Sequence, residues 1–380
     1  MVSSGKNVVK TKSSRTGSKR RLSGNLCERL GITYPIFGFS HSVEVTAALA
    51  KAGCYPMIGL SQETPEDIPA IVARVRDLVG DRPFGVDLLM PASITDQSDR
   101  SSMKANLPEE HKAFIEKLRE KYKVPPATKP TLHTTRVRSK QFFADQLEAV
   151  SVSRANAFAS AIGVSGETMS RMQRAGKLTF SLVGHPKHAQ AALDAGVDFI
   201  VAQGHDAGGH TGPIGTFSLV PQVVEIAGDT PVIAAGGVGH GRHVAASLAM
   251  GAQGAWLGTA WLTAREHALD DIRLRKVLNA RSQDTVISRS HSGKTTRQVR
   301  TSWSEEWEAP GAPKPLPMPF QQVLTGELLA GVEEHRIEPL IYTFAGQSVA
   351  WFNEEKTVAE IVERIMTETR DALDALARCT

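Results

Sequence analysis

The chain of 380 residues has only three cysteines, Cys27, Cys54 and Cys379, and no Cys-x-x-Cys pair. Three isolated cysteines do not make a disulfide framework. The chain also has no uninterrupted apolar run near the ~20 residues of a membrane span, and no apolar secretory segment near its start. These absences predict a protein of the reducing cytoplasm that does not span a membrane.

A dinucleotide fingerprint and a metal-ligand set are also missing. A doubly wound nucleotide-binding sheet carries Gly-x-Gly-x-x-Gly after its first strand, but after the apolar run from Tyr34 the sequence reads GFSHSVE. The pairs His205 with His210 and His240 with His243 have no Cys or carboxylate at ligand spacing. We therefore expect neither a Rossmann-type domain nor a bound metal.

What is present is a series of short apolar runs that end in turns, many of them rich in glycine. Three of these runs lie within residues 197–259, separated by segments whose apolar residues fall on one helical face. Strand–helix alternation predicts a parallel sheet, whose strands are apolar throughout because helices cover both faces. The eight expected strands are YPIFGF from Tyr34, YPMIGL from Tyr55, RPFGVDLLMP from Arg82, NAFASAIG from Asn156, KLTFSLVG from Lys177, VDFIVAQG from Val197, TPVIAAGG from Thr230 and GAQGAWLGT from Gly251.

Eight strand–helix units in about 230 residues predict an α/β fold of the (β/α)8 TIM-barrel type. A doubly wound open sheet is the competing architecture, and the missing fingerprint after the first strand disfavours it. In barrels the loops after strands seven and eight often bind phosphate. Here those loops contain Gly236-Gly237 and Gly258-Thr259, and glycine lets backbone N–H groups approach an anion closely. The sequence thus predicts a phosphate-bearing cofactor.

Four segments resemble one known family. They are YPIF from Tyr34, PFGVDL from Pro83, AGGHTG from Ala207 and PVIAAGGVGHGRHVAASLAMGAQGAWLGTAWL from Pro231. Together they are similar to the nitronate monooxygenase (2-nitropropane dioxygenase-like) family of FMN-dependent TIM barrels, and a weaker similarity extends over roughly residues 26–375. A sister group, the flavin-dependent enoyl-ACP reductases, shares the block from Pro231 and an AGGH-like turn.

The resemblance implies an FMN cofactor whose ring lies across the mouth of the barrel. Asp87 stands where the family more often has Asn, and an anionic carboxylate there would disfavour the reduced, anionic flavin. Gln347, in an AGQ turn similar to the family's, is a weaker candidate contact. The cofactor-binding residues implied by the resemblance are Gly38, Phe39, Asp87, Gln203, Gly208, Gly209, Gly236, Gly237, Leu257, Gly258 and Thr259.

His210 matches the family's active-site histidine, in the turn after the sixth expected strand. An imidazole titrates near neutral pH, so it could accept the α-proton of a nitroalkane or hydrogen-bond to an anionic nitronate oxygen. The alternative is a loop histidine bonded to backbone. The Gly-Gly-His-Thr-Gly setting favours the catalytic role.

The chain is expected to divide into four parts. Residues 1–25 contain seven Lys or Arg and no acid, which predicts a disordered basic tail. Because the whole chain is only +4, the remainder is −3, which does not indicate a nucleic-acid-binding body. Residues 26–264 should form the barrel, 265–339 a smaller capping subdomain for substrate, and 340–380 a return to the barrel with a C-terminal helix.

Two further segments contain basic residues that could contact an anion. Residues 95–145 are polar and predict an exposed, lid-like insertion over the barrel mouth. His133, Arg136 and Arg138 within it could reach an anionic substrate, although a solvated face is the commoner reason for such a run. HSGKT from His291 shares only its last two letters with a phosphate loop and is interpreted as chance.

The resemblance implies an oxidoreductase that converts alkyl nitronates or nitroalkanes, with dioxygen, to a carbonyl compound and nitrite. Two alternatives stay open: an NAD(P)H-dependent enoyl-thioester or related acceptor reductase, and a protein that binds FMN without turnover. The missing dinucleotide fingerprint favours the oxygen-dependent reaction, since a reductase must also admit NAD(P)H. We expect small-molecule partners and no specific nucleic acid. The sequence does not set the oligomeric state, and a homodimer stays open.

Overall fold

The computed structural model describes residues 24–91, 96 and 99–378. The expected basic tail and Cys379 therefore lie outside the described residues, except for the last two residues of the tail, Gly24 and Asn25, which begin helix α1 (Gly24–Leu30). Within the described part, no helix combines the length and the apolar character that crossing a membrane requires.

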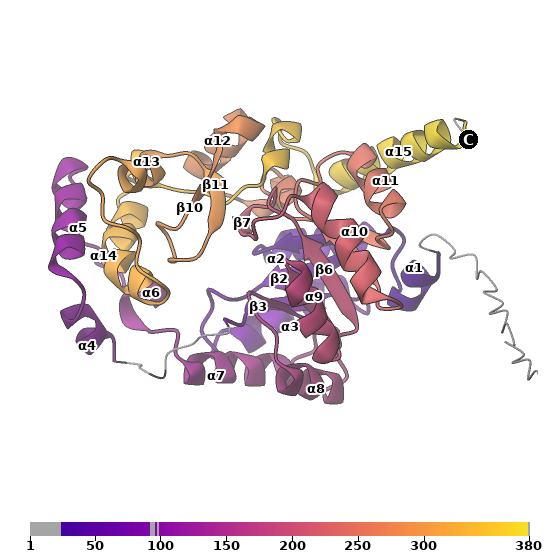
Figure 1. Ribbon diagram of the computed structural model, residues 1–380, viewed down its shortest axis with the longest axis horizontal. Helices are drawn as coiled ribbons and strands as arrows, with labels where there is room; N and C mark the ends of the chain where they lie inside the picture. The colour runs from indigo at the N-terminus through magenta and orange to yellow at the C-terminus, as the bar shows by residue number, and fades with distance from the viewer. Residues whose placement is uncertain (1–23, 92–95, 97–98, 379–380) are drawn as a thin grey trace, which may run out of the picture.

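Eight parallel strands close into a barrel in the order β1-β2-β3-β4-β5-β6-β8-β9. Helices lie around these strands (Figure 1). Closure is made by β1 and β9, where Ile36 is in register with Ala255. Each expected strand overlaps one observed strand, so the predicted (β/α)8 barrel is confirmed. The strands are β1 (Ile36–Ser40), β2 (Tyr55–Gly59), β3 (Gly85–Leu89), β4 (Ala157–Ala161), β5 (Leu178–Val183), β6 (Phe199–Gln203), β8 (Val232–Ala235) and β9 (Gly254–Leu257).

Large aromatic side chains fill the interior of the barrel. Phe180 and Phe199 stack with ring centroids 4.4 Å apart, and Trp256 belongs to the same buried cluster. Leu26 and Leu30 of α1 join this cluster, so α1 packs against the interior residues of the barrel. Alternate strand residues face outward onto the helices, and burial on both faces explains the continuous apolar runs of the sequence.

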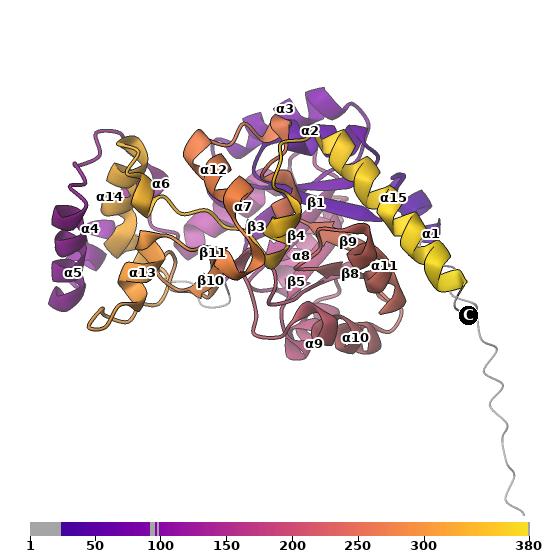
Figure 2. The ribbon, with the colours of Figure 1, turned by 90° about the horizontal axis from the view of Figure 1, so that it is seen from above.

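Helices surround the barrel, and α15 lies along α11 at one side (Figure 2). The side chains that accept from the first backbone N–H groups of these helices include Ser42 for α2 and Thr357 for α15. The barrel helices are α2 (Val43–Lys51), α3 (Ile68–Val79), α7 (Lys140–Ser151), α8 (Gly166–Arg174), α9 (Pro186–Asp194), α10 (Thr216–Ala227), α11 (Gly241–Ala249) and α15 (Val358–Ala377).

A cap is built from two excursions from the barrel, the first between β3 and α7 and the second between β9 and α15. They are far apart in sequence but gather at one end of the molecule (Figures 1 and 2). Leu118 from the first excursion and Trp303, Trp307 and Leu328 from the second share one buried cluster. The first excursion is therefore part of a packed unit, and it differs in this from the exposed insertion expected from its polar sequence. The cap helices are α4 (Arg100–Ala105), α5 (Glu109–Lys121), α6 (Leu132–Thr135), α12 (Asp271–Asn279), α13 (Ser302–Glu308) and α14 (Phe320–Glu334).

A small antiparallel sheet connects the cap to the barrel. Its order is β10-β11-β7, with β10 (Thr285–Ser288) and β11 (Thr296–Val299) from the second excursion and β7 (Gly209–His210) from the loop after β6. His210 is in register with Thr296. The sheet thus fixes the expected catalytic histidine between barrel and cap.

Candidate active site

His210 is held at both its backbone and its side chain. The Gln203 side chain, at the end of β6, donates from Nε2 to the His210 carbonyl oxygen at 2.6 Å. The imidazole Nε2 lies 3.0 Å from Oγ of Ser292, a residue of the HSGKT segment. The sequence reasoning found His210 but missed Ser292, because a serine in an irregular loop carries no pattern that places it beside a distant histidine.

The surroundings of His210 favour its neutral form. Burial, together with the positive charges of Arg138 and Lys294, lowers the pKa of His210 to about 4. The imidazole is therefore uncharged at neutral pH and can accept a proton. The nearby cations favour an anion beside it.

Asp87 lies in β3 in register with Gly59 of β2 and Ala159 of β4. It is buried, with 3% of its surface exposed, and its Oδ2 has no hydrogen-bond partner. Burial raises the pKa of Asp87 well above its usual range, because the charged form loses its hydration. A neutral carboxylic acid can donate a hydrogen bond as well as accept one, so the electrostatic objection to an anionic Asp beside a flavin does not apply.

We expect Asp87→Asn to stabilise the flavin-free protein at alkaline pH. The folded-state pKa of Asp87 lies above its unfolded value, so the folded state binds more protons and loses stability as pH rises above about 4. Asn has no such loss. The free energy of unfolding in urea at pH 8 should therefore be higher for the variant than for wild type, with a smaller difference at pH 5. Exposed Asp77→Asn is the matched control, and parallel pH profiles for Asp87→Asn and wild type would contradict the expectation.

The turns after β6, β8 and β9 come together with the turn at residues 345–347. The backbone N–H of Gly346 donates to Thr259 Oγ1 at 2.9 Å, and that of Gln347 donates to the Asp206 carbonyl at 2.9 Å. A Cβ on Gly208 would lie 2.7 Å from backbone atoms of residues 345 and 346, so glycine is required there by close packing. The AGQ turn is thus part of the same loop cluster as the phosphate candidates.

Gly236 and Gly237 both have positive φ, +96° and +73°. A Cβ on Gly236 would lie 2.8 Å from the carbonyl oxygen of Gly204, and one on Gly237 would lie 3.0 Å from Cβ of Asp206. The Asp206 carboxylate is itself engaged, since it accepts from the Thr216 N–H at 2.8 Å. This turn therefore needs glycine for both its backbone conformation and its packing.

Two of the remaining predicted residues, Gly38 and Phe39, are engaged in packing. A Cβ on Gly38 would run into Leu49 of α2, so this glycine serves helix packing as well. Phe39 faces the barrel interior, 6.4 Å from the Trp256 ring centroid. The remaining three are Leu257, whose carbonyl accepts from Trp261 Nε1 at 2.7 Å, Gly209, with φ +71°, and Gly258, which precedes the 3-10 helix at Thr259–Trp261.

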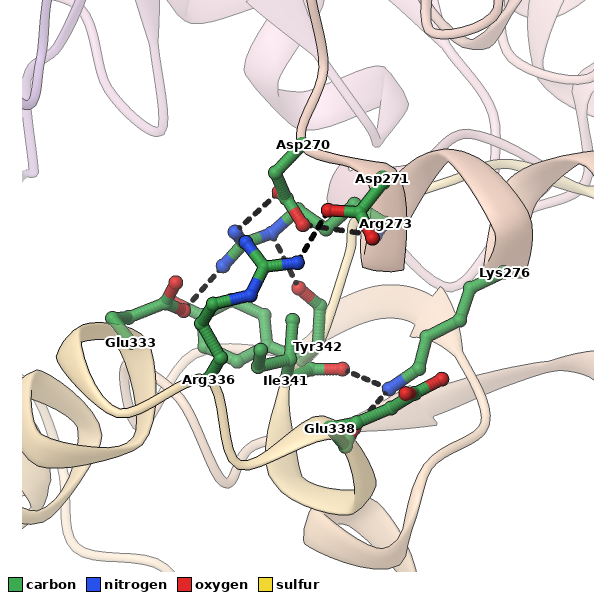
Figure 3. A network of polar contacts seen from close by, with 9 residues as sticks. All are labelled: Asp270, Asp271, Arg273, Lys276, Glu333, Arg336, Glu338, Ile341 and Tyr342. Atoms are coloured by element: carbon green, nitrogen blue, oxygen red, sulfur yellow. Dashed lines mark hydrogen bonds and ion pairs between the residues drawn. The ribbon is translucent and has the colours of Figure 1, made fainter.

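Ionic contacts fix the cap segment that carries Tyr342 (Figure 3). Arg273 of α12 donates from Nε to the Tyr342 carbonyl at 3.1 Å, and Lys276 donates to the Ile341 carbonyl at 2.6 Å. The Tyr342 ring then lies against His291, with ring centroids 4.6 Å apart. Sequence reasoning missed Tyr342. The acidic members of the network are Asp270, Asp271, Glu333 and Glu338.

The side chains around a small cavity continue this wall. A cavity of about 100 Å³ beside α14 is lined by Tyr342, His291, Gln322 and Leu329, among others. His291 directly precedes Ser292, which contacts His210. Over residues 24–91, 96 and 99–378, no group of three or more His, Cys, Asp or Glu side chains is placed to hold a metal ion.

Comparison with known proteins gives consistent results. The family model described as nitronate monooxygenase matches residues 25–368. The Mycobacterium tuberculosis protein Rv1533, which is named as a monooxygenase, is 34% identical over 92% of this chain and 97% of its own length. A Staphylococcus aureus protein named as a probable nitronate monooxygenase is 29% identical over 85% of this chain and 91% of its own length.

A solved structure agrees. Nitroalkane oxidase from Streptomyces ansochromogenes superposes with a TM-score of 0.77 at 26% identity, over 91% of this chain and 98% of that one. Together with the barrel and the residues around His210, these matches identify the protein as an oxidoreductase enzyme that belongs to the nitronate monooxygenase family.

Proposed function

We propose that the protein is an FMN-dependent enzyme that oxidises alkyl nitronates with dioxygen to a carbonyl compound and nitrite. The observation that carries the proposal is the position of His210, which the small sheet holds between barrel and cap with Nε2 3.0 Å from Ser292 Oγ. Burial and the charges of Arg138 and Lys294 lower its pKa and favour the neutral imidazole. Such a site suits a substrate that is an anion or becomes one by losing a proton. The names of the relatives, nitronate monooxygenase and nitroalkane oxidase, support the same substrate class.

The residues present fit a flavin. Asp87 offers a buried carboxyl oxygen without a partner to the polar edge of the ring. The turns at Gly236-Gly237 and Gly258-Thr259, with Gly208 and Gly209 nearby, would hold the phosphate through backbone N–H groups. Gln203 would position His210 and not contact the flavin itself, because its side-chain amide donates to the His210 carbonyl oxygen. Bound flavin would supply electron transfer between the substrate and dioxygen.

His210 would handle the proton. With a neutral nitroalkane, the unprotonated ring nitrogen takes the α-proton and leaves the nitronate in place. With a preformed nitronate no proton needs to be removed, and the same ring positions the anion. The hydroxyl of Ser292, 3.0 Å from Nε2, fixes the ring orientation for both tasks.

The proposal is tested by identifying the cofactor and its reductant. We expect the cofactor released by heat to be identified as FMN by chromatography. In a single-turnover experiment without oxygen, a short alkyl nitronate should reduce the bound flavin. NADH at the same concentration should reduce it far more slowly. Rapid bleaching by NADH and none by nitronate would contradict the proposal and favour an acceptor reductase.

A further inference from the structure

Arg138 is a buried cation without an anionic partner. It has 6% of its surface exposed, Nη2 donates to Gln62 Oε1 at 2.6 Å, and Nε has no hydrogen-bond partner. Within the described residues, no carboxylate lies within ion-pair distance of it. Burial lowers the pKa of Arg138 to about 10, so the guanidinium is charged at neutral pH. A buried, uncompensated charge is strongly unfavourable.

Two other cap arginines, Arg273 and Arg136, have carboxylate partners. Arg273 is paired with Asp270 at 2.7 Å and with Glu333. Arg136, two residues before Arg138, lies 3.7 Å from Glu66 with 52% of its side chain exposed. Arg138 thus differs from these arginines in being buried without a carboxylate partner. Arg136 is the natural control for it, because it is a nearby arginine that is exposed and paired.

Arg138 lies at the catalytic end of the barrel. It precedes α7 in the excursion that follows β3, and its partner Gln62 follows β2, so both are in loops at the C-terminal ends of strands. Active sites of TIM barrels are built from these loops. The charge of Arg138 is near enough to lower the pKa of His210.

A small cavity lies between the neighbours of these two groups. Gln322 lines the narrow gap that Arg138 also lines, and it lines the cavity of about 100 Å³ formed with Tyr342 and His291. His291 is next to the Ser292 that contacts His210. Gln322 thus connects the cavity to Arg138, and His291 and Ser292 connect it to His210.

We propose that Arg138 binds the negatively charged group of the substrate, so that the enzyme holds the nitronate anion in preference to the neutral nitroalkane. This inference rests on the proposed function. A nitronate carries two oxygens on one planar group, and the planar guanidinium fork matches such pairs. His210, being neutral, cannot supply the positive charge. Arg138 would hold the charge while His210 handles the proton.

The test compares Arg138→Gln with Arg136→Gln in the flavin-loaded enzyme. Nitrate, a planar anion that cannot be oxidised in this reaction, is titrated against the flavin absorbance and the thermal midpoint. We expect nitrate to bind wild type and Arg136→Gln alike, and Arg138→Gln at least tenfold more weakly. The KM for a short alkyl nitronate should rise about 10- to 100-fold in Arg138→Gln, as for loss of a charged hydrogen bond, with a smaller change in kcat. Arg138→Lys should recover part of the loss.

A second variant separates binding from folding. Arg138→Met removes the uncompensated charge, so without nitrate its thermal midpoint should equal or exceed that of wild type, and nitrate should no longer raise it. Unchanged nitrate affinity and nitronate KM in Arg138→Gln would overturn the inference while leaving the proposed function standing. If wild type binds nitrate through Arg138 but does not turn over nitronates, the proposed function fails and the anion site remains.

Discussion

Replacement of His210 by Asn should lower kcat/KM for a neutral nitroalkane by about 10²- to 10⁴-fold, the usual contribution of a general base. Asn can donate a hydrogen bond to an anionic oxygen but cannot take the α-proton. The kcat/KM for the preformed nitronate should therefore fall by less than about tenfold. Steady-state oxygen consumption with matched nitroalkane and nitronate substrates measures both.

The pH dependence sharpens this expectation. Because burial and nearby cations hold the pKa of His210 at about 4, the imidazole is already unprotonated from pH 6 to 8. The loss caused by His210→Asn should be constant over that range. Ser292→Ala, which removes the hydroxyl 3.0 Å from Nε2, should give a smaller loss with the same substrate preference. Equal turnover of the neutral nitroalkane by wild type and His210→Asn would refute the assigned role.

Substitution of Gly236 by Ala should release the cofactor. The residue has φ +96°, and the new Cβ would lie 2.8 Å from the Gly204 carbonyl oxygen, which belongs to the backbone after β6 and cannot rotate away. Strain of this kind is of order 1–3 kcal/mol, and a shift of the turn adds the loss of its contacts. We expect the affinity for FMN to fall by roughly 10- to 100-fold, at 1.4 kcal/mol per factor of ten, measured by fluorescence titration of the flavin-free protein.

Gly176→Ala is the matched control. Gly176 also has positive φ, +74°, but no atom lies within 4 Å of its Cβ position, and it precedes β5 at the opposite end of the barrel from the loop cluster. It should lose stability without losing flavin. Equal FMN affinity in Gly236→Ala and wild type would show that this turn does not hold the phosphate.

The barrel could be predicted from the sequence because each strand and each helix leaves its own pattern of apolar residues within a short segment of the chain. Strands such as Val232–Ala235 are apolar throughout because they are covered on both faces, and their spacing by helices fixes the topology. His210 could be found because its glycine-rich turn, AGGHTG from Ala207, resembles the active-site turn of the family. The predicted roles of the cofactor residues stay predictions.

The rest of the site depends on contacts that sequence patterns do not encode. Trp303 of the second excursion packs in one core with Leu118 of the first, but neither segment has a long amphipathic period that reveals the partner. Ser292 and Tyr342 reach the site only because the cap folds over the barrel. Arg138 stood in a basic, polar run for which a solvated face is the usual explanation, and only its burial without a carboxylate distinguishes it from Arg136.

The most direct test of the account is oxygen uptake by the purified protein given a short alkyl nitronate in the absence of NADH. The account predicts rapid uptake, with release of nitrite and the corresponding carbonyl compound. No uptake from nitronate, with bound flavin that NADH reduces rapidly, would contradict it and assign the barrel to an acceptor reductase.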